Sequence, residues 1–339
     1  MAMNTTPLPP RVTNAAASSR RWRDLVLLGG LVLLVVVGLV GLAAATGWEE
    51  TMAALGRLSL GEFIILLLLS LTNYFGRGMR WHLFAGQLGL GMGFWQNMRH
   101  FLGGFAMSVT PGRVGELVRM RWIRRETGWS FERTAPLVLV DRAADMSAMA
   151  VLLAMAVAFA ATGLKGGTPV AILALIAAFV VTRPKLLKTL SDTAYRITGK
   201  RMPRLFARIR RAAKSLEAFT HPSTLVLASI FGIAGWFAEG YAFYLLLNWM
   251  GADVGLWSAV GIFVLATLVG GATGAPGGLG GAEAVMVALL AVQNVPLEIA
   301  VAATLIIRVT TLWFAIAIGL AIFPFAERHS RKAENALER

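Results

Sequence analysis

The chain of 339 residues contains no cysteine, four histidines and only 15% charged residues. Without cysteine there is no disulfide, no thiolate metal site and no cysteine nucleophile. The histidines, at positions 82, 100, 221 and 329, lack the pairwise spacing of metal ligands, so we expect no metal and no cofactor. A typical soluble domain carries about 25% charged residues. The shortage of charge therefore excludes an ordinary water-facing surface.

Apolar residues dominate instead, at 57% of the chain. Residues 25–45 contain no charge and are long enough to cross a bilayer, which takes about 20 residues. Arg20-Arg21 before this run and Ala43-Ala44-Ala45 at its end also fit a twin-arginine signal peptide, but the apolar core of a signal peptide is only about 7–15 residues long. We interpret the run as a retained anchor. Further spans are predicted at 60–76, 134–161, 168–182, 223–250 and 297–325.

Two other apolar segments are interrupted by proline and glycine. The segment 94–118 contains Gly103-Gly104 and Pro111-Gly112, and the segment 257–293 contains the run from Pro276 to Gly281. Non-helical backbone at membrane depth occurs only where protein or a watery cavity covers it. We therefore predict two re-entrant helical hairpins within an all-α polytopic membrane protein of about six full spans.

The basic residues indicate orientation. Of 32 Lys and Arg residues, 28 lie in the stretches 1–24, 76–133, 183–222 and 326–339, and the formal net charge is +14. Cytoplasmic loops carry an excess of Lys and Arg. We therefore expect the protein in a bacterial cytoplasmic membrane, with both termini on the cytoplasmic side. The two hairpins then enter from opposite sides. Because the cations flank membrane segments, nucleic acid is not expected as a partner.

The two interruptions resemble each other in sequence. One reads Pro111-Gly112-Arg113-Val114-Gly115-Glu116, and the other reads Pro276-Gly277-Gly278-Leu279-Gly280, with Glu283 three residues later. Proline ends the incoming helix, and the next helix begins with exposed N–H groups that suit an anion. Inverted repeats with broken helices are a recurring construction of transporters. The alternative interpretation is that the Pro-Gly breaks serve only close packing.

Ionisable residues inside a membrane cost about 2.5–3.5 kcal/mol each and are functional candidates. The carboxylates that we interpret as coupling or gating groups are Glu116, Glu283, Asp141, Asp145 and Glu239. The residues that we expect to bind the substrate are Arg113, Arg119, Arg308, Gly112, Gly277 and Gly278, because a guanidinium matches phosphate oxygens. Arg142, Pro111 and Pro276 are interpreted as supporting residues. The alternative is a salt-bridge network that orders the bundle.

These motifs resemble a known family. The first Pro-Gly motif with Arg119, and the second with Glu283, are similar to the two signatures of the flippase-like membrane domain. That domain forms the transmembrane region of lysylphosphatidylglycerol synthase and stand-alone UPF0104-type membrane proteins. The resemblance covers roughly residues 20–325 and adds Arg77 and Arg80 as supporting residues. Asp141 departs from it, since a glutamate is expected there.

The resemblance implies a membrane protein that handles lipids. We expect translocation of an anionic phospholipid or a polyprenyl-phosphate lipid, with membrane lipids as partners and a homo-oligomer left open. We expect no aminoacyl-transferase domain and no catalytic residue. A non-transporting accessory protein of a lipid or envelope pathway, such as a hopanoid pathway, is the chief alternative, and a lipid-phosphate enzyme is a second. The expected organisation is a polar tail (1–24), a flippase-like domain (25–325) containing a basic loop (183–222), and a second tail (326–339).

Overall fold

The computed structural model describes residues 58–108, 114–160, 167–181, 183–199 and 201–337, together with the isolated positions 49, 53 and 56. The expected first span, 25–45, lies outside the described residues. Within the described part the regular structure is entirely helical, as an all-α membrane protein requires.

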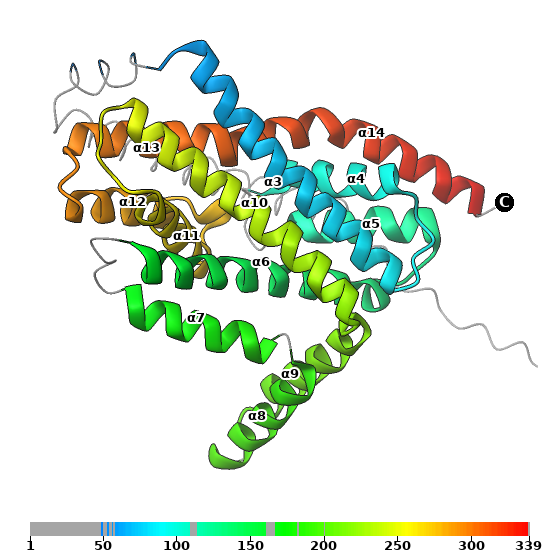
Figure 1. The fold of residues 1–339 in the computed structure, drawn as a ribbon. Coiled ribbons are helices and arrows are strands. Elements are labelled where there is room, and N and C mark those ends of the chain that lie inside the picture. The colour runs from blue at the N-terminus through cyan, green and yellow to red at the C-terminus, as the bar shows by residue number, and fades with distance from the viewer. Residues whose placement is uncertain are drawn as a thin grey trace, which may run out of the picture.

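The helices fall into three groups along the chain (Figure 1). The first group is α3 (Leu60–Gln87), α4 (Phe94–Gly103), the 3₁₀ turn η1 (Gly104–Met107), α5 (Val114–Thr127) and α6 (Phe131–Phe159). The second is α7 (Gly167–Val181), α8 (Pro184–Ile197), α9 (Pro203–Leu216) and η3 (Glu217–Phe219). The third is α10 (Pro222–Trp249), α11 (Leu256–Ala272), η4 (Pro276–Gly278), α12 (Gly281–Val292), α13 (Leu297–Arg308), the π-helical turn η5 (Val309–Trp313) and α14 (Phe314–Leu337).

The five predicted spans that fall on described residues, from 60–76 to 297–325, coincide with helices. Among the described residues, three helices are long and apolar enough to cross a membrane: Leu60–Gln87, Pro222–Trp249 and Leu297–Ala336. The helix predicted at 60–76 continues to Gln87, so Arg77 and Arg80 lie buried in the bundle rather than in a cytoplasmic loop. The last helix likewise continues through the expected tail at 326–339, as far as Leu337.

The first and third groups repeat each other in register. α3 and α10 both have 28 residues, and each is followed by a turn containing a glycine with positive φ, Gly89 (79°) or Gly251 (81°). The next helix then begins after Gly93 or Gly255, which has extended backbone in both cases. The repeat therefore extends well beyond the two Pro-Gly motifs from which it was predicted.

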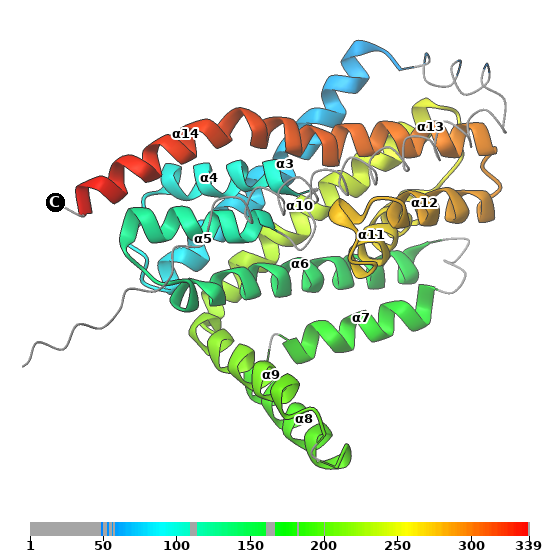
Figure 2. The ribbon, with the colours of Figure 1, turned by 180° about the vertical axis from the view of Figure 1, so that it is seen from behind.

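The long helices α3 and α10 pack against each other more extensively than any other pair and cross side by side in Figures 1 and 2. Glycines permit the close approach: a Cβ on Gly235 would lie 2.8 Å from Asn73 Oδ1, and one on Gly76 would lie 3.3 Å from the Phe231 carbonyl oxygen. Asn73 contacts Gly235, whereas Gly76, later on α3, contacts Phe231, earlier on α10. The two helices therefore run antiparallel. The first helices of the two repeats thus run in opposite directions through the molecule.

The remaining helices are exchanged between the repeats. α6, from the first repeat, packs on α11 of the third group, while α14 packs on α4, η1 and α5 of the first. α11 and α12 pack against each other as a helical hairpin around η4. The basic loop forms a second hairpin, α8–α9, which extends away from the bundle (Figures 1 and 2). Each broken segment is therefore covered by a long helix from the other repeat.

Candidate functional site

Four ionisable side chains meet between α3 and α6. Arg77 and Arg80 lie three residues apart on α3, and Asp141 and Asp145 lie four apart on α6, so each pair shares one helix face. Arg77 Nη2 is 2.8 Å from Asp145 Oδ2, and Arg80 Nη2 is 2.6 Å from both Asp141 Oδ1 and Asp145 Oδ1. All four residues are buried. We call these four residues the α3–α6 ion cluster.

Helix α10 completes the surroundings of this cluster. Trp236 Nε1 donates a hydrogen bond to Asp145 Oδ1 at 3.1 Å, and its ring faces the Arg77 guanidinium at 5.2 Å. Gly232 leaves room for Arg80, since a Cβ there would lie 3.1 Å from Arg80 Nη1. The cluster thus joins three helices, and removal of one partner would leave a buried charge without compensation.

A second ion pair lies at the break between α11 and α12. Arg308 Nε is 2.5 Å from Glu283 Oε1, and Arg308 Nη2 donates to the Gly277 carbonyl oxygen at 2.7 Å. Arg308 and Glu283 are both buried. We call Arg308, Glu283 and Gly277 the hairpin site.

The backbone of the break explains why glycine is required there. Gly277 (62°), Gly278 (68°) and Gly280 (82°) all have positive φ, which a residue with a Cβ rarely adopts. Pro276 begins the 3₁₀ turn, and Gly278 approaches Gly270 closely enough that an added Cβ would lie 3.1 Å from the Gly270 carbonyl carbon. This arrangement turns the Gly277 carbonyl toward Arg308.

The π-helical turn η5 follows Arg308 directly. Tyr74 of α3 donates a hydrogen bond from its hydroxyl to the Thr311 carbonyl. The hydroxyls of Thr310 and Thr311 donate to backbone carbonyls of the preceding turn, at 3.0 and 2.6 Å from the Ile306 and Ile307 oxygens. Single π-helical turns inside longer helices occur frequently at functional sites. The turn connects the hairpin site to α3.

Glu239 lies between the two sites. It is 4% exposed and interacts electrostatically with both Arg77 and Arg308. Asn73, fully buried on α3, is another of its neighbours. A buried carboxylate in range of two arginines from different sites can change partners when either arginine binds another anion.

Arg119 occupies a different environment. Its guanidinium lies over the ring of Phe101 at 4.4 Å and within 5.3 Å of the Trp81 ring centroid. Gly104 makes room for it, because a Cβ there would overlap the Arg119 side chain. Phe101 also faces Arg77, at 5.7 Å, so its ring is near two guanidinium groups. Arg119 is therefore beside the α3–α6 ion cluster rather than in the hairpin site.

Other predicted residues lie at the edge of these sites or outside the described part. Arg142 is partly exposed and its Nη1 is 3.8 Å from Asp145 Oδ2. Glu116 belongs to helix α5, although its side chain is not described. Pro111, Gly112 and Arg113 lie outside the described residues.

Sequence reasoning missed three polar contributors to this interior, Asn73, Tyr74 and Trp236. Asn73 carried a signal, because an amide within the apolar run 60–76 is unusual. Tyr74 and Trp236 carried none, since aromatic residues occur throughout the spans and only the fold places their polar atoms beside partners.

Two ion clusters near the end of α5 were also missed. Glu126 Oε1 is 2.9 Å from Arg99 Nη2, and Glu126 Oε2 is 3.1 Å from His100 Nε2. Burial opposes the ionisation of Glu126, but hydrogen bonding to His100 and the charge of Arg99 outweigh it and hold the pKa of Glu126 below its ordinary value. On α14, Glu327 pairs with Arg121 at 2.7 Å and Arg125 at 2.8 Å. These ion pairs connect α5 to α4 and to α14.

The fold and its interior define a class: a helical membrane protein with ion pairs buried beside an interrupted helical hairpin. Comparison with known families then identifies it further. The lysylphosphatidylglycerol synthase TM region matches residues 26–319, so the chain belongs to this family.

Similar proteins come from archaea. A UPF0104 membrane protein of Methanothermobacter thermautotrophicus is 26% identical over 333 residues, covering 86% of this chain and 94% of that protein. A UPF0104 membrane protein of Methanocaldococcus jannaschii is 22% identical over 244 residues, covering 67% of this chain and 97% of that protein.

Proposed function

We propose that this protein moves an anionic lipid between the two leaflets of a membrane. The observation that carries the proposal is the hairpin site, where one buried guanidinium is shared between Glu283 and the Gly277 carbonyl. The family match supports a role connected with membrane lipids. The lipid headgroup is an anionic phosphate, either of a phospholipid or of a polyprenyl-phosphate carrier.

The charges of Arg308 and Glu283 indicate how headgroup binding would change the hairpin site. Without lipid, Arg308 and Glu283 compensate each other, and a guanidinium prefers the planar, bidentate geometry that phosphate oxygens also offer. A phosphate that binds Arg308 displaces Glu283 and leaves one excess negative charge in a poorly solvated place. Uptake of a proton or a new contact of Glu283 removes that excess, which links headgroup binding to a rearrangement of the hairpin.

We assign the other buried carboxylates to the same cycle. Glu239 exchanges between Arg77 and Arg308, while Asp141 and Asp145 hold Arg77 and Arg80 in place. Arg113, Arg119 and Glu116 of the first Pro-Gly motif act as the counterpart of the hairpin site on the other side of the membrane. Alternating use of two broken segments in repeats of opposite direction is a known construction of transporters.

The orientation belongs to the proposal as well. We place both termini, the basic α8–α9 hairpin and the ion pairs of Glu126 and Glu327 on the cytoplasmic side of a bacterial inner membrane. Exposed basic residues of α8–α9 then face the anionic cytoplasmic leaflet.

The test is reconstitution of the full chain into liposomes with a panel of fluorescent lipids. A membrane-impermeant quencher then measures how fast phosphatidylglycerol, phosphatidylethanolamine and a polyprenyl phosphate exchange leaflets, with and without a pH gradient. We expect exchange of an anionic lipid above the rate of protein-free liposomes. Binding of these lipids without exchange would favour the accessory role, and turnover of a headgroup would indicate an enzyme.

A further inference from the structure

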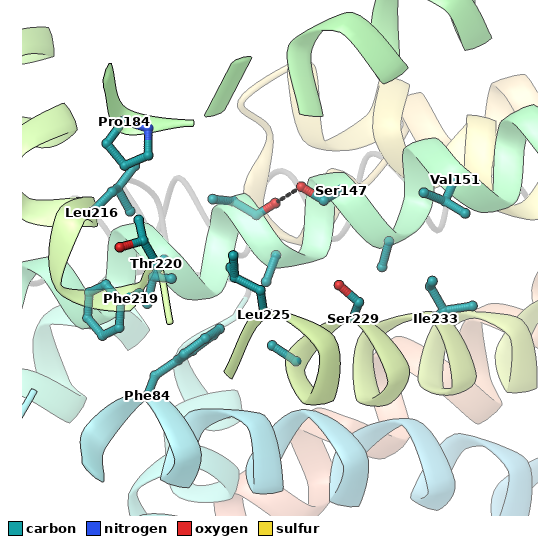
Figure 3. Close-up of a pocket in the computed structure, with 15 residues that line it drawn as sticks. Phe84, Ser147, Val151, Pro184, Leu216, Phe219, Thr220, Leu225, Ser229 and Ile233 are labelled. Carbon is teal, nitrogen blue, oxygen red and sulfur yellow. Dashed lines mark hydrogen bonds between the residues drawn. The ribbon is translucent and has the colours of Figure 1, made fainter. Parts of the chain in front are cut away.

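A narrow groove runs between α6 and α10, with Phe84 of α3 reaching into one end (Figure 3). Its two long walls alternate small and branched side chains: Val140, Ala144, Ser147, Ala148 and Val151 on α6, and Leu225, Ala228, Ser229 and Ile233 on α10. The groove encloses about 90 Å³. The groove is open on one side, and a space of this size holds a short stretch of a slender hydrocarbon chain whose remainder lies along the outer surface.

The groove offers a ligand almost only hydrocarbon. Ser147 Oγ donates to the Ala143 carbonyl oxygen at 2.7 Å, as the dashed line in Figure 3 shows. Thr220 Oγ1 likewise donates to the Glu217 carbonyl oxygen at 2.9 Å. Hydroxyls that are bonded to their own helix backbone present little polarity to a neighbour.

The surfaces beside the groove are apolar and exposed. On α10, Val226 and Ile230 are 58% and 54% exposed, and on α7, Ile172 and Phe179 are 54% and 57% exposed. In a membrane protein such faces contact lipid tails. The groove therefore lies beside exposed apolar faces of the kind that contact acyl chains in a bilayer.

One end of the groove lies beside the basic α8–α9 hairpin. Pro184, Leu216 and Phe219 close it at the α8–α9 hairpin (Figure 3). Arg183 directly precedes Pro184, and α9 carries Arg204, Arg208, Arg210, Arg211 and Lys214 in the turns before Leu216. An anionic headgroup is attracted to this end, while its hydrocarbon chain extends away from it.

The other side of the same helices holds the α3–α6 ion cluster. Ala144 adjoins Asp145 in the chain, and a Cβ on Gly232 would touch both Ala148 Cβ and Arg80 Nη1 at 3.1 Å. The groove and the α3–α6 ion cluster therefore lie on two sides of the same contact between α6 and α10.

We propose that this groove binds one acyl chain of an anionic phospholipid, with the headgroup at the α8–α9 end. The inference rests on the proposed function in one respect, that the bound lipid is of the transported class. An unbranched acyl chain fits so narrow a groove better than a polyprenyl chain, whose methyl branches recur along its length.

Photo-crosslinking tests the proposal. The full chain is reconstituted into liposomes containing phosphatidylglycerol with a diazirine in one acyl chain, or a diazirine-bearing polyprenyl phosphate in a parallel sample. After irradiation, mass spectrometry locates the adducts. We expect the acyl probe to label segments 143–151 and 225–233, and Ser229→Phe to lower this labelling about ten-fold, which corresponds to about 1.4 kcal/mol.

The matched control is Ala234→Phe, which adds the same bulk to an exposed position of α10 outside the groove. Labelling in this variant should equal that of the unmodified chain. Adducts only outside the two segments, labelling by the prenyl probe alone, or full labelling of Ser229→Phe would overturn the groove assignment. Leaflet exchange measured on the same liposomes reports separately on the proposed function, so either can fail alone.

Discussion

Asn73 and Gly235 occupy equivalent positions in the two repeats and contact each other where α3 crosses α10. A residue that touches its own counterpart lies at the approximate twofold axis that relates the repeats. One helical turn further along, Arg77 of the first repeat is equivalent to Glu239 of the second. The two repeats therefore place opposite charges at matching positions beside the axis.

Packing at the hairpin gives the first prediction. A Cβ on Gly270 would lie 2.7 Å from Ala282 Cβ and 2.9 Å from the Ala282 nitrogen, whereas one on Gly271 meets no atom within 4 Å. Gly270→Ala should therefore destabilise the protein by about 1–3 kcal/mol through overpacking. Gly271→Ala should stabilise it by about 0.4–1 kcal/mol. Thermal unfolding of the two purified variants in the same detergent makes the comparison, and equal midpoints would contradict this description of the hairpin.

The α3–α6 ion cluster gives the second prediction. Arg80→Gln leaves Asp141 without its arginine, and breaking a buried ion pair costs about 3–5 kcal/mol. Adding Asp141→Asn to the same chain removes the uncompensated charge and should restore part of the lost stability. The measurement is the unfolding midpoint of both variants in nanodiscs. A double variant that is less stable than Arg80→Gln would show that the cluster does not work as a charge pair.

The third prediction concerns the pH dependence of stability at Glu126. Because the pKa of Glu126 is lower in the folded protein than in the unfolded chain, its ionisation stabilises the fold above the unfolded value, about 4.3. That contribution disappears as the pH falls through the folded pKa. The unfolding midpoint of Glu126→Gln should be below that of the unmodified chain at pH 7. The difference should shrink as the pH falls below about 4.3 and vanish once the pH is below the folded pKa. Glu217→Gln, at an exposed carboxylate, serves as the control; a gap for Glu126→Gln that persists unchanged in acid would refute the assignment.

The positions of the helices were predictable from sequence, because long apolar runs leave few alternatives to a helix. The Pro-Gly break at Pro276 was also predictable, since proline and glycine act locally. The pairing of Arg308 with Glu283, rather than with Asp141 or Asp145, was not, because nothing in the chain states which helices become neighbours. The packing of α12 against α13 decides it, because it places Arg308 beside Glu283.

Residues at helix crossings show the same limit. Gly78 and Gly240 are ordinary glycines in sequence, yet each lies where the next helix crosses: a Cβ on Gly78 would lie 2.5 Å from Met98 Sδ, and one on Gly240 would lie 3.2 Å from Val260 Cα. Gly78 and Gly240 lie equally far from the starts of their helices, α3 and α10. This equivalence could be recognised only once the first residue of each helix was known.

Arg308 offers the most direct test of lipid translocation through the hairpin site. The full chain, Arg308→Gln and the control Arg328→Gln, which changes an exposed arginine on α14, are reconstituted into liposomes at equal protein density. The rate at which fluorescent phosphatidylglycerol exchanges leaflets is then measured for each. We predict that the Arg308→Gln rate falls at least about ten-fold, equivalent to about 1.4 kcal/mol, while Arg328→Gln keeps the unmodified rate. Equal rates for all three proteins would contradict the role given to Arg308.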